Sequence, residues 1–104
     1  MTKYDEISDT YNDIRDDKIG LSAIGSIIKK LGYRISVLDM GCGTGKPIAC
    51  MFDSLVSEYT GIDESQRMID KFKENTLGAV GLRMNMAELD FPEECFDFVF
   101  AWGS

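Results

Sequence analysis

The sequence predicts one α/β domain built on a parallel β-sheet with helices packed against it. Two observations lead to this prediction. Short β-branched or aromatic runs alternate with helical patterns, and a glycine-rich turn follows the first of these runs. Crossovers between such strands are right-handed and leave neighbouring strands parallel. Because ligands of these sheets bind at the carboxyl ends of the strands, the residues at those ends are the candidates for function.

Two helices are predicted before the sheet. From Tyr4 to Asp17, the apolar residues Ile7, Tyr11 and Ile14 recur at helical spacing among acidic residues. From Leu21 to Leu31, isoleucines recur three or four residues apart, and the glycine that follows is typical of a helix end. We therefore expect residues 1–33 to form a leading helical segment.

The sheet should contain four strands, because four apolar runs are bounded by turn residues. These runs are Ile35–Asp39, Tyr59–Ile62, Val80–Met84 and Phe96–Ala101. A helix should begin at Pro47 and run to about Val56, since proline suits a first helical turn. Another helix should cover Ser65–Asn75, and its inner face should hold Met68, Ile69 and Phe72.

Composition narrows the classes of protein that this chain can represent. With 104 residues, of which 44% are hydrophobic and 28% charged, it suits a single globular domain. The longest apolar runs are far below the roughly 20 residues of a membrane-spanning helix, and no secretion signal opens the chain, so we expect a cytoplasmic protein with no membrane partner.

Charge and cysteine content exclude further classes. A net charge of -7 without a basic stripe disfavours a nucleic-acid partner, because the phosphate backbone repels an acidic surface. The 3 cysteines are an odd number without metal-like spacing, so neither a disulfide framework nor a metal site is predicted.

The glycine-rich turn contains Gly41, Gly43 and Gly45, which would let the backbone approach a ligand closely. A phosphate-binding loop needs a glycine at position 40 and a hydroxyl residue at position 47, and neither is present. A dinucleotide-binding turn would want its third glycine where Lys46 stands, which weakens that alternative. Asp63 ends the second strand 22 residues after Gly41, close to the spacing of a ribose-binding acid; capping of the next helix is its structural alternative.

Together these segments resemble the class I S-adenosylmethionine-dependent methyltransferases, in particular the small-molecule and ubiquinone-biosynthesis-like group. The turn Val37–Gly45 matches the first motif of that family, and Gly61–Ile69 resembles its second. Met86–Val99 is similar to the third motif and the fourth strand, and Tyr4–Asn12 resembles the leading helix. The resemblance covers nearly the whole chain, and three motifs in order are more specific than one.

The resemblance implies a Rossmann-like, three-layer sheet with strand order 3-2-1-4, in which residues 34–104 form the cofactor-binding half. Such methyltransferases have seven strands, so the sequence is expected to stop within the fold. The fourth strand would then be an exposed edge, which predicts a homodimer through that strand or through swapped elements.

The resemblance also implies roles at named positions, with S-adenosylmethionine as cofactor and S-adenosylhomocysteine as product. Asp39 would face the methionine amino group, the three glycines would underlie the methionine and ribose, and Asp63 would hold the ribose. Met86 and Ala87 would flank the adenine, whose amino group would donate to Asn85, where the family usually has Asp. The predicted cofactor-binding set is Asp39, Gly41, Cys42, Gly43, Gly45, Asp63, Glu64, Met68, Asn85, Met86, Ala87 and Trp102.

No catalytic residue is predicted. The chain has 0 histidines to activate Cys42 as a nucleophile, and methyl transfer from a sulfonium depends mainly on alignment of the acceptor. Asp97 and Trp102 are candidates to orient a small-molecule acceptor, although a polar residue at a strand start is the structural alternative for Asp97. The alternatives to a methyltransferase are a non-catalytic cofactor-binding or interaction module and half of a nicotinamide-dependent dehydrogenase.

Overall fold

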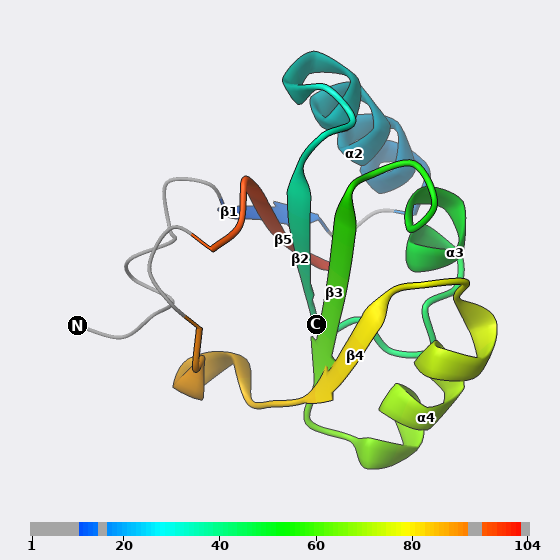
Figure 1. Ribbon diagram of the computed structural model, residues 1–104, viewed down its shortest axis with the longest axis vertical. Coiled ribbons are helices and arrows are strands. Elements are labelled where there is room, and N and C mark those ends of the chain that lie inside the picture. Colours follow the sequence, from blue (N-terminus) through cyan, green and yellow to red (C-terminus); the bar gives the residue numbers. More distant parts are fainter. Residues whose placement is uncertain (1–10, 15–16, 92–94, 103–104) are drawn as a thin grey trace.

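The computed structural model describes residues 11–14, 17–91 and 95–102, which form a five-stranded parallel sheet with helices against it (Figure 1). The sheet order is β1-β5-β2-β3-β4. In chain order the elements are β1 Tyr11–Ile14, α2 Asp17–Leu31, β2 Ser36–Met40, α3 Ile48–Phe52, β3 Glu58–Asp63, α4 Gln66–Asn75, β4 Val80–Arg83, the 3-10 helix η2 Met86–Glu88 and β5 Phe98–Trp102.

The predicted strand order 3-2-1-4 is confirmed, since it corresponds to β4, β3, β2 and β5. β2 is central: Leu38 pairs with Thr60 of β3 on one side and with Val99 of β5 on the other. All of these pairings are parallel, so the carboxyl ends of β2, β3 and β4 lie at the same edge of the sheet.

The additional strand β1 corrects the prediction of a helix over Tyr4–Asp17. The backbone of Tyr11–Ile14 is a parallel strand that pairs with β5, with Tyr11 opposite Val99. The pairing partner lies at the other end of the sequence, so local spacing could not reveal it. Residues 4–10 and 15–16 of the predicted helix lie outside the described part of the chain. Because β1 covers β5, the expectation that the fourth strand is an unpaired edge was wrong.

Two apolar layers cover the two faces of the sheet. One contains residues of α2, α3 and α4, such as Ile28, Ile48 and Phe72, packed on Val37 and Phe100. The segment around η2 covers the other face through buried Leu89 and through the partly buried side chains of Met84, Met86, Phe91 and Phe96. Phe96 lies in this second layer and not in the layer of Phe98 and Phe100, although strict alternation along the strand would place all three on one face. It precedes β5 and packs edge-on against Phe91, with the two ring centroids 5.0 Å apart.

Capping residues mark the ends of α2 and α4, and both helices differ from the prediction in one respect. α4 begins after Ser65, whose hydroxyl accepts a hydrogen bond from the Met68 amide at 3.3 Å. Its inner face holds Ile69 and Phe72, whereas Met68 is 37% exposed and was wrongly predicted to face inward. α2 begins earlier than predicted, at Asp17, and ends where Gly32 adopts a φ of 92°.

α3 is shorter than predicted, ending at Phe52 rather than near Val56. The carboxylate of Asp53 turns away from the helix and accepts the backbone amide of Leu77 at 2.7 Å. Pro47 stands immediately before the first helical residue.

Phe72 is fully buried and lies against glycines from three segments. A Cβ on Gly61 of β3 would be 2.7 Å from the ring, one on Gly81 of β4 3.0 Å, and one on Gly45 of the turn 3.1 Å. The three glycines thus leave the space that the ring fills, which seats α4 directly on the sheet beside the glycine-rich turn.

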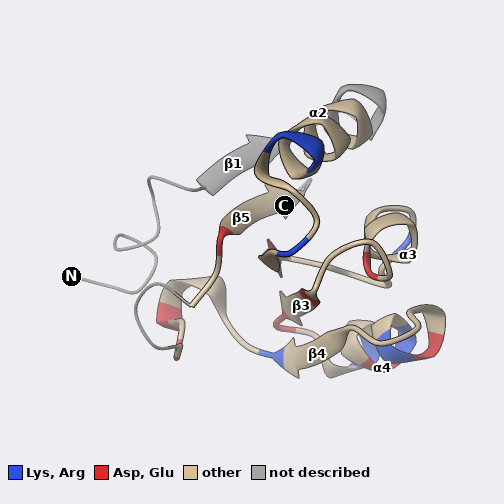
Figure 2. Cartoon of the chain, turned by 45° about the horizontal axis from the view of Figure 1, so that its top comes forward, with Lys and Arg blue, Asp and Glu red and all other residues tan. Residues whose placement is uncertain are grey.

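Within the described residues, no helix combines the length and apolar character needed to cross a membrane. Figure 2 shows the basic residues on several separate elements, including the end of α2, α4 and the end of β4. Acidic residues stand at the carboxyl end of β3, beside the glycine-rich turn.

Candidate functional site

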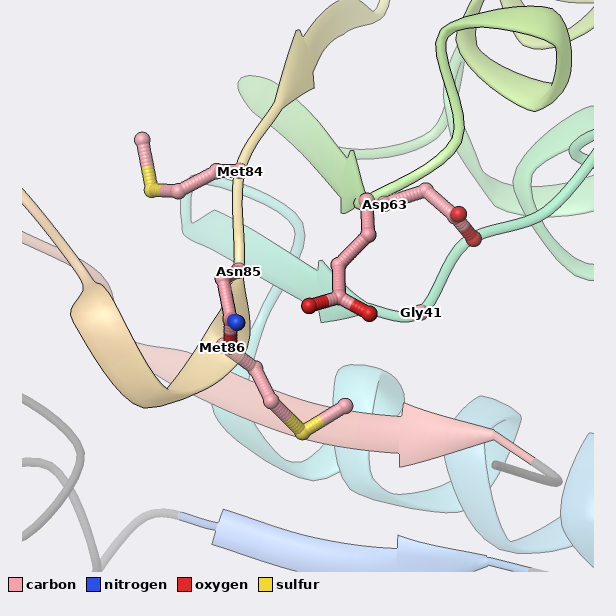
Figure 3. A pocket seen from close by; sticks show the side chains of 6 residues that line it. Gly41, Asp63, Met84, Asn85 and Met86 are labelled. Carbon is pink, nitrogen blue, oxygen red and sulfur yellow. The ribbon is translucent and has the colours of Figure 1, made fainter.

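A pocket of about 190 Å³ opens where β2, β3 and β4 end, as the sheet topology predicts. Figure 3 shows the pocket between the glycine-rich turn and the segment that follows β4. Its lining residues are Gly41, Asp63, Glu64, Met84, Asn85 and Met86. Two carboxylates and no basic side chain therefore line it.

The glycine-rich turn is fixed to the end of β3 by its own backbone. The amides of Gly41 and Cys42 both donate to the carbonyl of Ile62, at 2.8 and 2.9 Å. Gly41, Gly43 and Gly45 all have positive φ angles, of 77°, 57° and 84°, which other residues adopt only with strain. The turn therefore requires its glycines for conformation as well as for close approach by a ligand.

Asp63 connects this turn to the start of α4. Its Oδ2 accepts the Gly43 amide at 3.1 Å, and its Oδ1 accepts the Ser65 amide at 2.9 Å. The backbone carbonyl of Asp63 accepts the Met84 amide at 2.9 Å, which holds the end of β3 against the segment after β4. The helix cap itself is Ser65, so the structural alternative of Asp63 as the cap was wrong.

Asp39, at the buried side of the same turn, carries an oxygen without a partner. Its Oδ2 accepts the Tyr59 hydroxyl at 2.8 Å, while its Oδ1 is buried and has no hydrogen bond within the described structure. Burial raises the pKa of Asp39 to about 7, with Asp63 adding to the effect and the Tyr59 hydrogen bond opposing it. A donor, especially a cationic one, would satisfy the free oxygen.

Cys42 has the environment of a structural thiol. Burial raises its pKa well above the ordinary value, and the nearby carboxylates of Asp39 and Asp63 raise it further. Its Sγ lies 3.7 Å from the carbonyl of Gly43. Since only the thiolate is a good nucleophile, the site disfavours covalent chemistry at Cys42.

Asn85 orders the wall of the pocket opposite the turn. It precedes η2, and its side-chain oxygen accepts the Ala87 amide at 2.8 Å. Met86, which is half-buried, lines the pocket just beyond it. An amide oxygen can accept a second hydrogen bond, and the amide nitrogen of Asn85 remains as a donor.

Comparison with known proteins decides the family. A family model described as a methyltransferase domain matches residues 37–104, which include the turn, the pocket and β5. The chain belongs to this methyltransferase-domain family.

Two curated relatives of this methyltransferase domain are much longer than it. It is 32% identical over 80 residues to a demethylmenaquinone methyltransferase of Staphylococcus aureus (strain MRSA252), covering 70% of this chain and 33% of that protein. It is 37% identical over 71 residues to a cycloartenol-C-24-methyltransferase of Arabidopsis thaliana, covering 62% and 21%. The chain thus spans a third or less of these relatives.

Solved structures share the fold of the methyltransferase domain. The magnesium protoporphyrin IX methyltransferase ChlM of Synechocystis PCC 6803, crystallised with bound S-adenosylhomocysteine, matches with a TM-score of 0.63 at 18% identity, over 77% of this chain and 38% of that one. The YcgJ protein of Bacillus subtilis matches with a TM-score of 0.62 at 24% identity, over 77% and 37%.

Of the twelve residues predicted for the site of this methyltransferase domain, five line the pocket, namely Gly41, Asp63, Glu64, Asn85 and Met86. Met68 lies on the exposed side of α4 and does not line the pocket. Asp97 lies at the amino end of β5, where its carboxylate accepts the Ser36 amide at 2.8 Å. It therefore lies at the opposite edge of the sheet from the carboxyl ends that form the pocket, as the structural alternative for Asp97 predicts. The side chain of Trp102 lies outside the described residues.

Two residues of the site were missed. Met84 lines the pocket, and its position directly after the third strand was a usable signal. Tyr59 donates to Asp39 from the neighbouring strand, with Tyr59 opposite Val37 in the register. No sequence signal identifies that pair, because it depends on how two strands align. Within the described residues, no cluster of three metal-ligating side chains exists.

Proposed function

We propose that this methyltransferase domain binds S-adenosylmethionine at the carboxyl ends of β2, β3 and β4, and serves methyl transfer to a small-molecule acceptor in the complete protein. The observation that carries the proposal is the pocket between the glycine-rich turn and the Asn85–Met86 wall, with acidic residues at the end of β3. Support also comes from the relatives, whose names describe methyltransferases of demethylmenaquinone and cycloartenol.

The residues present fit the cofactor. The free buried oxygen of Asp39 suits an ammonium donor, which is the group that the methionine portion would offer. Gly41, Gly43 and Gly45 would leave room for the methionine and ribose, and a carboxylate at the end of β3 would accept the ribose hydroxyls.

The adenine would lie on the opposite wall of the pocket. Met86 would pack on the ring, with Ala87 beside it, and the oxygen of Asn85 would accept from the adenine amino group. Asn85 already accepts the Ala87 amide, so both hydrogen bonds would share one neutral oxygen.

When bound, S-adenosylmethionine supplies a methyl group on a sulfonium, whose departure leaves a neutral thioether. The residues of this chain therefore need only bind and orient the reactants. The acidic pocket suits a cofactor that carries the sulfonium charge, whereas its two carboxylates would repel the pyrophosphate of a nicotinamide dinucleotide. A non-catalytic binding module remains the second candidate, favoured by the neutral Asn85.

Calorimetric titration of the chain with S-adenosylhomocysteine and, separately, with NAD tests the proposal. We expect saturable binding of S-adenosylhomocysteine that weakens in Asp39→Asn, and no binding of NAD. NAD binding without a response to S-adenosylhomocysteine would overturn it. Transfer of labelled methyl groups to quinol or sterol acceptors by the complete protein would separate an enzyme from a binding module.

We also propose a cytosolic location and a homodimer joined through swapped elements. Free Cys50 and Cys95, both exposed, support a reducing compartment. Edge pairing through β5 no longer supports the dimer, because β1 occupies that edge. Sedimentation at high concentration tests the dimer, and a monomer would contradict it.

A further inference from the structure

The hydroxyl of Tyr59 is the only hydrogen-bond partner of the Asp39 carboxylate in the part of the chain that the structure describes. It donates to Oδ2 at 2.8 Å, while Oδ1 has no partner. Both side chains are almost fully buried, and a buried oxygen without a donor is costly. The contact therefore leaves one oxygen of Asp39 bonded to the protein and the other available to a ligand.

The alignment of β2 with β3 produces this contact. Asp39 pairs with Gly61 of β3, and Tyr59 lies two residues earlier, opposite Val37. Val37 and Tyr59 belong to the apolar layer of α2, α3 and α4, and because alternate residues of a strand share a face, Asp39 lies on that face too. On the other side, Asp39 pairs with apolar Phe100 of β5. Since Gly61 has no side chain, Tyr59 is the residue of β3 that reaches Asp39 across the face.

Packing fixes the ring of Tyr59. The ring stacks on that of Phe72, with centroids 6.5 Å apart and an interplanar angle of 29°. Phe72 is itself fully buried against the glycines that seat α4 on the sheet. A hydroxyl on a ring held in this way cannot follow a rotating carboxylate, so it fixes the direction of the Asp39 carboxylate.

The other titratable groups that face this pair are acids. Asp63 from the end of β3 and the thiol of Cys42 from the glycine-rich turn interact with Asp39, and Asp53 after α3 interacts with Tyr59. Burial and Asp63 raise the pKa of Asp39, whereas the hydrogen bond from Tyr59 lowers it. Burial and these acids raise the pKa of Tyr59 well above its ordinary value, so the hydroxyl keeps its proton and remains a donor.

We propose that Tyr59 is a positioning residue for the cofactor, whose hydroxyl holds Oδ2 of Asp39 and so presents an ionised Oδ1 to the ammonium group of the methionine portion. This inference rests on the proposed function and deepens it, by adding a residue that acts only through Asp39. Without the hydroxyl, the carboxylate loses both its fixed direction and a donor that favours its charge. An ammonium group binds an ionised carboxylate more strongly than a neutral carboxyl group, so the loss should be largest where Asp39 is easily protonated.

The test is calorimetric titration of Tyr59→Phe with S-adenosylhomocysteine at about pH 6.5 and about pH 8.5. This variant keeps the ring that packs on Phe72 and loses only the hydroxyl. We expect roughly tenfold weaker binding at the lower pH, because the pKa of Asp39 rises and less of it is ionised, and at most about twofold at the higher pH. Tyr33→Phe removes a hydroxyl from an exposed tyrosine, and as the matched control it should bind as the wild type does at both pH values.

Two further measurements separate positioning from a general structural effect. In an Asp39→Asn background, which cannot ionise, the additional change Tyr59→Phe should cause no loss of affinity that depends on pH. In the absence of any ligand, carboxyl NMR of carbon-13-labelled aspartate should show Asp39 titrating at a higher pH in Tyr59→Phe than in the wild type. The Asp39 signal is assigned by its disappearance in Asp39→Asn.

Equal losses of affinity at both pH values would show a structural role alone and would overturn the proposal, as would an unchanged titration of Asp39. If Tyr59→Phe does not fold, 3-fluorotyrosine at position 59 replaces it as a stronger donor of nearly the same shape. It should tighten binding at the lower pH, and unchanged or weaker binding there would contradict the proposal. Failure of the wild type to bind S-adenosylhomocysteine at either pH would instead refute the proposed function.

Discussion

Gly61→Ala should destabilise the chain through a contact on the buried side of β3. The added Cβ would lie 2.7 Å from two ring atoms of Phe72 and 2.8 Å from the Cβ of Cys42. Real Cβ atoms do not approach so closely, so α4 or the glycine-rich turn must move. Overpacking of this kind costs about 1–3 kcal/mol, and because each kcal/mol lowers the melting temperature of a small domain by about 4–8 °C, we expect a fall of roughly 5–20 °C.

Thermal unfolding followed by circular dichroism measures this effect, and Gly78→Ala provides the control. A Cβ on Gly78 meets no atom within 4 Å, and its φ is not positive, so this substitution should leave the melting temperature unchanged or raise it slightly. Gly61→Ala combined with Phe72→Leu should lose less stability than the sum of the two single variants, because the smaller side chain relieves the clash. Wild-type melting of Gly61→Ala, or additive losses in the double variant, would refute the packing argument.

Three further outcomes follow from the site. Burial raises the pKa of Asp39 to about 7, so the folded chain holds the Asp39 proton more tightly than the unfolded chain does. The free energy of unfolding should therefore fall as pH rises from 3.8 through about 7. Over the upper part of that range, binding of S-adenosylhomocysteine should tighten as the carboxylate ionises, and both trends should disappear in Asp39→Asn when melting and affinity are measured against pH. Asn85→Asp should tighten binding by giving the adenine amino group a charged acceptor, whereas equal affinity would remove the adenine from that wall. Iodoacetamide should alkylate exposed Cys50 much faster than Cys42, as mass spectrometry of timed samples would show, and fast alkylation of Cys42 would contradict its raised pKa.

Local patterns predicted the elements whose signals lie within one segment. Hydrophobic period and turn chemistry predict the four strands of the core sheet, the helix that begins beside Ser65, and the burial of Ile69 and Phe72. For Tyr11–Ile14 the local pattern gave a wrong prediction. Its apolar spacing suits a helix, but the segment is a strand because it pairs with β5. Tertiary pairing overrode local spacing there, as it does in short segments generally.

The sequence predicted where the site lies, but not the hydrogen bonds within it. Spacing placed Gly41 and Asp63 at neighbouring strand ends, and the pocket contains both. It could not show that Asp63 bonds Gly43 and Ser65, or that Tyr59 reaches Asp39, because these contacts depend on the register of β2 against β3. Asp97 was predicted as a candidate to orient the acceptor because of its residue type, but it lies at the amino ends of the strands, where it accepts the Ser36 amide.

The pairing of β1 with β5 joins a segment that is synthesised early to one that is synthesised much later. Tyr11 leaves the ribosome early, yet its partner Val99 is among the last described residues to emerge. The central strands β2 and β3 can pair while the chain is still growing, but this edge cannot close until β5 is available. Completion of the sheet therefore depends on the arrival of β5, and a nascent chain halted before Phe98 would leave both β1 and the open side of β2 without their neighbour.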